Sequence, residues 1–172
     1  MRFSSLRQLA DLCGEARMTI GRFMLAEQAV ETGVSEQEAF RQMQEYYLVM
    51  KEAVRRGIEE PVSSRSGLTG GDAPRVHAYR QNGDPALGAG PSLAMAYALA
   101  VSEVNASMGR IVATPTAGSC GIIPGVFVSS QERWGWDDER MVFGLFCAGA
   151  IGYVIANQSF ISGAEGGCQA EV

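Results

Sequence analysis

The chain has 172 residues, of which 47% are hydrophobic, and its formal net charge at pH 7 is −5. This length is enough to bury the core of one globular domain. The basic residues are scattered and do not form the cluster typical of nucleic-acid-binding proteins, so we expect no nucleic-acid partner.

The first residues, MRFSSLRQLADLC, lack the apolar segment of a secretory signal. The cysteines stand at positions 13, 120, 147 and 168 and form no CxxC pair. This spacing predicts no disulfide framework. We therefore expect a cytoplasmic protein whose thiols are either buried or act as ligands.

Charged residues are concentrated in residues 1–60, which we expect to form an N-terminal helical hairpin. One apolar stripe at helical spacing runs from Leu6 to Met24, with Ser4 or Ser5 as its cap. The sequence TGV at residues 32–34 then breaks the first helix.

The second helix of the hairpin is indicated by Ser35 and Glu38, which have the spacing of a capping box. We expect this helix to end at Gly57, because glycine is the commonest residue just beyond a helix. The hairpin is expected to serve packing or to present a surface to a partner.

Residues 61–172 hold most of the glycines, and we expect them to form the catalytic region, in one continuous domain with the hairpin. The region opens with VSSRSGLTGGDAP, a polar loop without a Walker motif. Hydroxyls and unhindered backbone amides can bind an anionic ligand, and the alternative is a simple connector rich in turns. The candidate substrate-binding residues of this first loop are Ser63, Ser64, Thr69 and Gly70.

A buried helix is expected to start near Pro91, and Ser102, Glu103 and Asn105 place polar groups on it that need partners. It leads to a second polar loop, VATPTAGSCGIIPG. A helix that began near Gly118 would lower the pKa of Cys120 through its dipole. The candidate substrate-binding residues here are Thr114, Thr116, Gly118 and Ser119.

The last long helix is expected to begin at Asp137 or Asp138. Its apolar run, residues 141–156, is shorter than the roughly 20 residues that cross a bilayer, so we expect a core helix and no membrane span. Small residues recur at four-residue spacing and form a smooth ridge against which another helix can pack; they are Gly144, Ala148, Gly152 and Ala156. After this run, Asn157 opens a third polar segment that leads into ISGAEGGCQAEV. With no alternating strand pattern, the sequence predicts an all-α, bundle-like fold in which the three polar loops converge on one site.

Two single residues limit the chemistry. The only lysine, Lys51, lies on the charged hairpin, which disfavours a pyridoxal phosphate Schiff base in the glycine-rich region. The only histidine, His77, cannot by itself make a zinc site with several imidazole ligands. Thiolates, carboxylates and hydroxyls remain, and they suit a metal cluster that acts as a Lewis acid.

Three motifs, SSRSGLTGGDAPRV, ATPTAGSCGIIPG and ISGAEGGCQAEV, resemble the alpha chain of bacterial iron–sulfur-dependent L-serine dehydratase along essentially the whole sequence. This resemblance implies a helical catalytic region that works with a beta chain or domain. It also implies a [4Fe-4S] cluster, with Cys168 as one ligand. The family's other two cluster cysteines lie further on, so we expect the chain to be a truncated alpha chain.

The activity implied by the resemblance is the conversion of L-serine to pyruvate and ammonia by β-elimination of water. In this scheme the cluster iron binds the serine hydroxyl, a base removes the α-proton, and the two upstream loops hold the substrate carboxylate and ammonium. The base is open between Glu165, Glu171, Cys120 and His77, or lies on the partner chain. Two alternatives are a cluster hydro-lyase for another small hydroxy acid and a non-catalytic helical interaction subunit. We further expect an oligomer.

Overall fold

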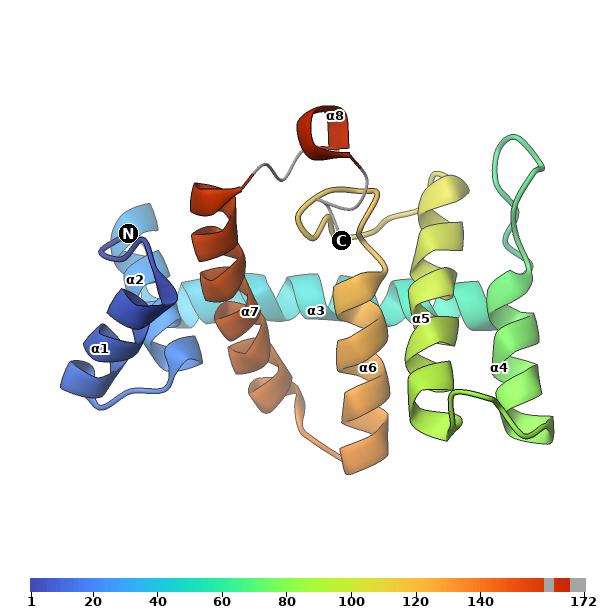
Figure 1. Ribbon diagram of the computed structural model, residues 1–172, viewed down its shortest axis with the longest axis horizontal. Coiled ribbons are helices and arrows are strands. Elements are labelled where there is room, and N and C mark those ends of the chain that lie inside the picture. Colours follow the sequence, from blue (N-terminus) through green and yellow to red (C-terminus); the bar gives the residue numbers. More distant parts are fainter. Residues whose placement is uncertain (160–162, 168–172) are drawn as a thin grey trace. The chain divides into compact units, whose positions relative to one another are not determined.

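The computed structural model describes residues 1–159 and 163–167, and within these residues the chain is helical and contains no strand (Figure 1). The helices are α1 Leu6–Ala16, α2 Ile20–Thr32, α3 Glu36–Glu59, α4 Asp72–Asn82, α5 Ala89–Ala106, α6 Ile122–Trp134, α7 Asp138–Gln158 and α8 Gly163–Gly166. The predicted all-α class is confirmed.

The chain forms two compact units. Unit 1 comprises Met1–Glu45 and the described part of Asp137–Ile161, and so contains α1, α2, the start of α3 and α7. Unit 2 comprises Tyr46–Trp136 and the described part of Ser162–Val172, and so contains the rest of α3 with α4, α5, α6 and α8. The expected division at residue 60 stays a prediction.

The apolar stripe at the start of unit 1 belongs to two helices, so the single helix expected over Leu6–Met24 is wrong. Arg17 takes a left-handed conformation, with a φ of 53°, and ends α1. Local caps then define both helices: the hydroxyls of Ser5 and Thr19 each accept a backbone N–H of the first turn that follows. Periodicity cannot reveal such a break, because both helices bury residues of the same stripe.

The start of α3 follows the predicted capping box in part. The Ser35 hydroxyl accepts the backbone N–H of Glu38 at 3.1 Å. The Glu38 carboxylate, in turn, accepts hydrogen bonds from the side chains of Arg41 and Gln42. The hydroxyl of the box therefore caps the helix, while its carboxylate stabilises the following turn.

The end of α3 differs from the prediction, because the helix continues to Glu59 and Gly57 lies inside it. Gly57 is buried, and a Cβ at this position would collide with the backbone of Ala100 on α5. Position 57 is therefore a glycine because α3 packs closely on α5, and not because the helix ends there.

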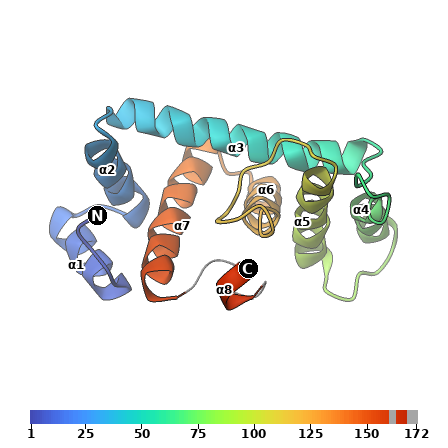
Figure 2. The same ribbon diagram turned by 90° about the horizontal axis from the view of Figure 1, so that it is seen from above.

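In unit 2, α4, α5 and α6 stand beside one another, and α3 runs across α6 and α5 and ends beside α4 (Figure 2). The start of α5 at Ala89 agrees with the expectation near Pro91. The α3–α4 loop and the α5–α6 loop lie at the same end of these helices, on opposite sides of α5. Unit 2 thus brings the first two predicted polar loops to one end of one helix.

Helix α7 begins as expected, because the Asp137 carboxylate accepts the N–H of Arg140 at 2.8 Å. It is 21 residues long, and by length and composition it could cross a membrane. A third of its most apolar stretch is buried, and core helices of soluble proteins reach the same length and apolarity, so these two properties do not distinguish a core helix from a membrane span. One side of α7 is buried, whereas Ile151 and Ile155 are 38% and 51% exposed. The small-residue ridge is only partly covered: Gly152 and Ala156 are exposed.

Close contact between α2 and α7 in unit 1 gives a test of the packing. A Cβ on buried Gly21 would collide with the backbone of Phe143, whereas helical Gly14 has open space around it. We expect Gly21→Ala to lower the free energy of unfolding by about 1–3 kcal/mol, the usual cost of overpacking. The control Gly14→Ala should be neutral or raise it by roughly 0.5–1 kcal/mol. Urea denaturation measures both, and equal effects would contradict the contact.

Candidate functional site

The first polar loop is fixed by a buried carboxylate on α5. Glu103 is only 7% exposed, and its oxygens accept the backbone N–H groups of Gly71 at 3.0 Å, Asp72 at 2.7 Å and Ala73 at 3.1 Å. These are free amides of the first turn of α4, which has no side-chain cap of its own. Glu103 therefore caps α4 from a neighbouring helix, where the positive end of the α4 dipole also stabilises its charge.

A second contact holds the same loop to α5. The backbone N–H of Arg65 donates to the carbonyl of Ala106, the last residue of α5, at 3.2 Å. The α3–α4 loop is thus tied to the C-terminal turn of α5 at two separate points.

Within this loop the hydroxyl of Ser64 is already engaged. It accepts the N–H of Thr69 at 3.1 Å and lies 3.1 Å from the Ser66 hydroxyl, while the Ser64 N–H donates to the Thr69 carbonyl at 2.8 Å. Ser63 and Thr69 are exposed. Gly70, with a φ of 142°, lets the loop close on the backbone of Val62, which a Cβ would prevent.

The second polar loop is ordered by Asn105 and Ser119. The side-chain amide of Asn105 donates to the carbonyl of Ala117 at 2.9 Å. The buried Ser119 hydroxyl donates to the carbonyl of Thr114 at 2.9 Å and lies 3.2 Å from the Thr116 hydroxyl. Predicted residues of the second loop therefore contact one another, and the loop is held to the same turn of α5 as the first.

One buried hydroxyl of the second loop lacks a hydrogen-bond partner in the described part of the chain. The hydroxyl oxygen of Thr114 is buried and has no hydrogen-bond partner among the residues that the structure describes. Buried polar groups in proteins nearly always have a partner, because an unsatisfied one costs free energy. This hydroxyl is therefore a candidate to bind a ligand, either as donor or as acceptor.

Cys120 does not have the environment that the sequence suggested. Helix α6 begins at Ile122 rather than near Gly118, and the Cys120 side chain is completely buried. Burial raises the pKa of the Cys120 thiol above its usual value. The expected lowering of this pKa by a helix dipole is therefore wrong.

The remaining candidates for the base are spread over the chain. His77 lies on α4, is half-buried, and stacks on the ring of Tyr97 with 6.1 Å between the ring centroids. Glu165 is exposed on α8. Glu171 lies outside the described residues, as does Cys168, the predicted metal ligand.

A metal site is not formed within residues 1–159 and 163–167, which contain no group of three His, Cys, Asp or Glu side chains that could hold an ion. Cys13 and Cys147 belong to unit 1 and Cys120 to unit 2, and burial raises the pKa of all three thiols. Within the described residues they form no group of three, so they do not by themselves supply the three or four thiolates of an iron–sulfur cluster.

Sequence reasoning did not identify Glu103 as a site residue. The expectation that polar groups on an apolar helix need partners is confirmed for Glu103 and Asn105. The signal was a carboxylate in an otherwise apolar helix, but the amides that it caps carry no side-chain signature.

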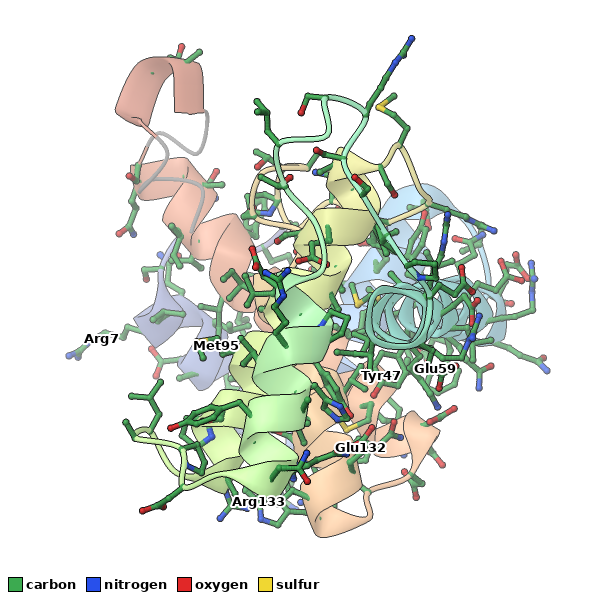
Figure 3. The ribbon with its side chains drawn as sticks, turned by 90° about the vertical axis from the view of Figure 1, so that its right-hand side faces the viewer. Arg7, Tyr47, Glu59, Met95, Glu132 and Arg133 are labelled. Atoms are coloured by element: carbon green, nitrogen blue, oxygen red, sulfur yellow. The ribbon has the colours of Figure 1, made fainter. Side chains whose placement is uncertain are left out.

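A separate cavity of about 710 Å³ lies at the other end of unit 2, where α5 begins and α6 ends. Arg80, Glu132 and Arg133 contribute its charged lining, and none of the sequence-predicted site residues reaches it. Figure 3 shows Glu132 and Arg133 at the end of the unit opposite the α3–α4 loop. The two polar loops and this cavity are therefore different regions of the unit.

Comparison with known proteins gives consistent matches. The family model described as serine dehydratase alpha chain matches residues 15–172. The chain is 42% identical over 170 residues to a probable L-serine dehydratase alpha chain of Bacillus subtilis, covering 99% of this chain and 56% of the relative. It is 34% identical over 168 residues to an L-serine dehydratase alpha chain of Peptoniphilus asaccharolyticus, covering 98% and 58%. The chain thus spans little more than half the length of these two relatives.

The burial of Cys120 predicts low reactivity. Its raised pKa keeps the Cys120 thiol protonated at neutral pH, so the free energy gained by burying the neutral thiol is fully present there. This contribution to stability is lost as the pH rises from the pKa of an exposed thiol through the higher pKa of the buried one. We expect iodoacetamide at pH 8 to label Cys120 much faster after unfolding in urea than in the folded chain. Mass spectrometry of the labelled peptide measures this, and equal rates would contradict the burial.

The cysteine arrangement predicts that the 172-residue chain alone binds no stable [4Fe-4S] cluster. A cubane needs about three or four thiolates, and the described residues contain no group of three side chains that could hold a metal ion. The measurement is iron content and visible absorbance after anaerobic reconstitution. Four irons per chain would contradict this expectation and would indicate that Cys168 joins cysteines of the described part.

Proposed function

This chain belongs to the serine dehydratase alpha-chain family, and we propose that it forms the substrate-binding part of an enzyme that converts L-serine to pyruvate and ammonia. The observation that carries the proposal is the match of the family model over residues 15–172. It is supported by two relatives that cover nearly the whole chain and bear the name L-serine dehydratase alpha chain, one of them as probable.

The two polar loops suit a small zwitterionic amino acid. The Thr114 hydroxyl can donate to the substrate carboxylate, and the exposed hydroxyls of Ser63 and Thr69 can do the same. Both loops are held at the C-terminal end of α5, where the partial negative charge of the helix dipole favours the substrate ammonium. Hydroxyl donors, the exposed Arg65 of the first loop and this dipole together match both charges of the substrate.

The reaction proceeds in three balanced stages. A base takes the α-proton of L-serine, and the hydroxyl leaves the β-carbon as water with a proton, which gives aminoacrylate. Aminoacrylate takes up a proton at the β-carbon, loses one from nitrogen, and becomes the imine. Water then hydrolyses the imine to pyruvate and ammonia, so the water lost in the first stage is regained.

The identity of the base stays a prediction. A Cys120 thiol with a raised pKa is protonated at neutral pH, which suits a proton donor better than a base. His77, Glu165 and Glu171 remain candidates in this chain, and the partner chain is the other possible source. The [4Fe-4S] cluster, with Cys168 as a ligand, also stays a proposal, to which the described residues add no further ligand.

We propose the cytoplasm as the location, because Cys13, Cys120 and Cys147 are free thiols, as is usual in a reducing compartment. The relatives named alpha chain support a beta chain as partner. An oligomer of the assembled enzyme is part of the same proposal.

The direct test is the release of pyruvate from L-serine by the assembled enzyme, purified without oxygen and followed by reduction of pyruvate with NADH and lactate dehydrogenase. Pyruvate formation at a rate that saturates with L-serine is the expected result. Elimination from another hydroxy acid without action on L-serine would favour a different hydro-lyase. No elimination with either class of compound would favour an interaction subunit.

Thr114 gives a residue-level test of the substrate site. Thr114→Val removes the unused hydroxyl and keeps the side-chain shape, so we expect the KM for L-serine to rise about tenfold, the cost of a hydrogen bond to a charged group. Stability should be unchanged or higher, because an unsatisfied buried polar group is removed.

The matched control is Thr32→Val, which makes the same substitution on an exposed residue of unit 1 whose hydroxyl donates to the carbonyl of Gln28. Its KM should equal that of the wild type. A KM for Thr114→Val within twofold of the control would remove Thr114 from the substrate site.

A further inference from the structure

A single turn of α5 holds both polar loops. Glu103 and Ala106 contact the first loop, and Asn105 contacts the second. Residues of an α-helix are separated by about 100° around its axis, so Asn105 projects roughly opposite to Glu103. The loops accordingly lie on opposite sides of α5, as Figures 1 and 2 show.

Stability alone is a poor reason for a buried carboxylate at position 103. Removing a charge from water is costly, and a Ser or Asp in the α3–α4 loop would cap α4 without that cost. The structure instead caps α4 from α5, thirty or more positions along the chain from Gly71, Asp72 and Ala73. The consequence of this arrangement is that the position of the first loop depends on α5.

Asn105 acts in the same way on the other side. Its amide donates to the carbonyl of Ala117, which lies between Thr116 and Gly118 in the second loop. The bond joins the end of α5 to the loop that also carries the unused Thr114 hydroxyl.

We propose that Glu103 and Asn105 are positioning residues, which fix the two polar loops relative to the end of α5 and so the geometry of the proposed substrate site. This inference rests on the proposed function, because it assumes that both loops bind L-serine. Neither side chain touches substrate in this proposal, and each acts through the loop that it holds.

The experiment compares Glu103→Gln, Asn105→Ala and the double variant in the assembled enzyme. Glutamine keeps the length of the side chain but has one acceptor oxygen in place of two, so some of the three amide bonds are lost. We expect each single variant to raise the KM for L-serine about tenfold with a smaller change in kcat. The rise in KM in the double variant should be smaller than the product of the rises in the two single variants, because both residues act on one site.

The matched control is Tyr47→Phe in the same unit. Tyr47 is completely buried, and its hydroxyl donates to the side chain of Gln131 at 2.8 Å, away from both loops. This variant should lose thermal stability to a similar extent as Glu103→Gln while its KM stays within twofold of the wild type.

A second readout does not need activity. Hydrogen exchange of the amides in residues 62–73 of the 172-residue chain should become faster in Glu103→Gln and stay unchanged in Tyr47→Phe. Faster exchange in Glu103→Gln with an unchanged KM would make Glu103 a purely structural cap and overturn its positioning role. Unchanged exchange in this variant would also overturn that role, because the loop would then not depend on Glu103. If the wild-type enzyme does not act on L-serine, the proposed function fails, and the exchange result still separately shows whether Glu103 holds the loop.

Discussion

The capping of α4 by the buried Glu103 carboxylate is the interaction on which the polar end of unit 2 depends. A lone buried carboxylate is strongly unfavourable, but here three amides and the end of a helix dipole compensate the charge. The carboxylate in turn provides acceptors for these amides, which would otherwise lack hydrogen-bond partners at the start of α4. Since donor and acceptor lie on different helices, α4, its preceding loop and α5 are fixed together.

Local features of the sequence predict much of this fold. Helical periodicity without alternation gives the all-α class, and caps that act within one turn, at Ser5, Ser35 and Asp137, are readable because both partners are close in sequence. The polar composition of the two loops likewise marks them as candidate binding segments. Each of these predictions depends on residues that lie within a few positions of each other.

The features that could not be predicted all depend on contacts between distant segments. In the sequence Gly57 looks like the end of a helix, and only its contact with Ala100 shows that it lies inside α3. Helix α4 has no capping side chain in its own loop, because Glu103 on α5 caps it. The pKa of Cys120 depends on how deeply the loop before α6 is buried, and the sequence motif does not encode that depth. For the candidate site, composition marked the two polar loops but not the residues that hold them in place.

The proposed site depends on hydrogen bonds from hydroxyl groups, and this explains why the residues that hold its loops in place matter. The loops offer neutral hydroxyls, such as that of Thr114, and their arginines, Arg65 and Arg110, are exposed rather than buried. The attraction between opposite charges falls slowly with distance, whereas a hydrogen bond weakens steeply when its angle departs from linearity. A site of neutral donors therefore depends on accurate placement, and two loops on opposite sides of a helix keep that placement only if the helix fixes both. One turn of α5, carrying Glu103 and Asn105, meets this requirement with few residues.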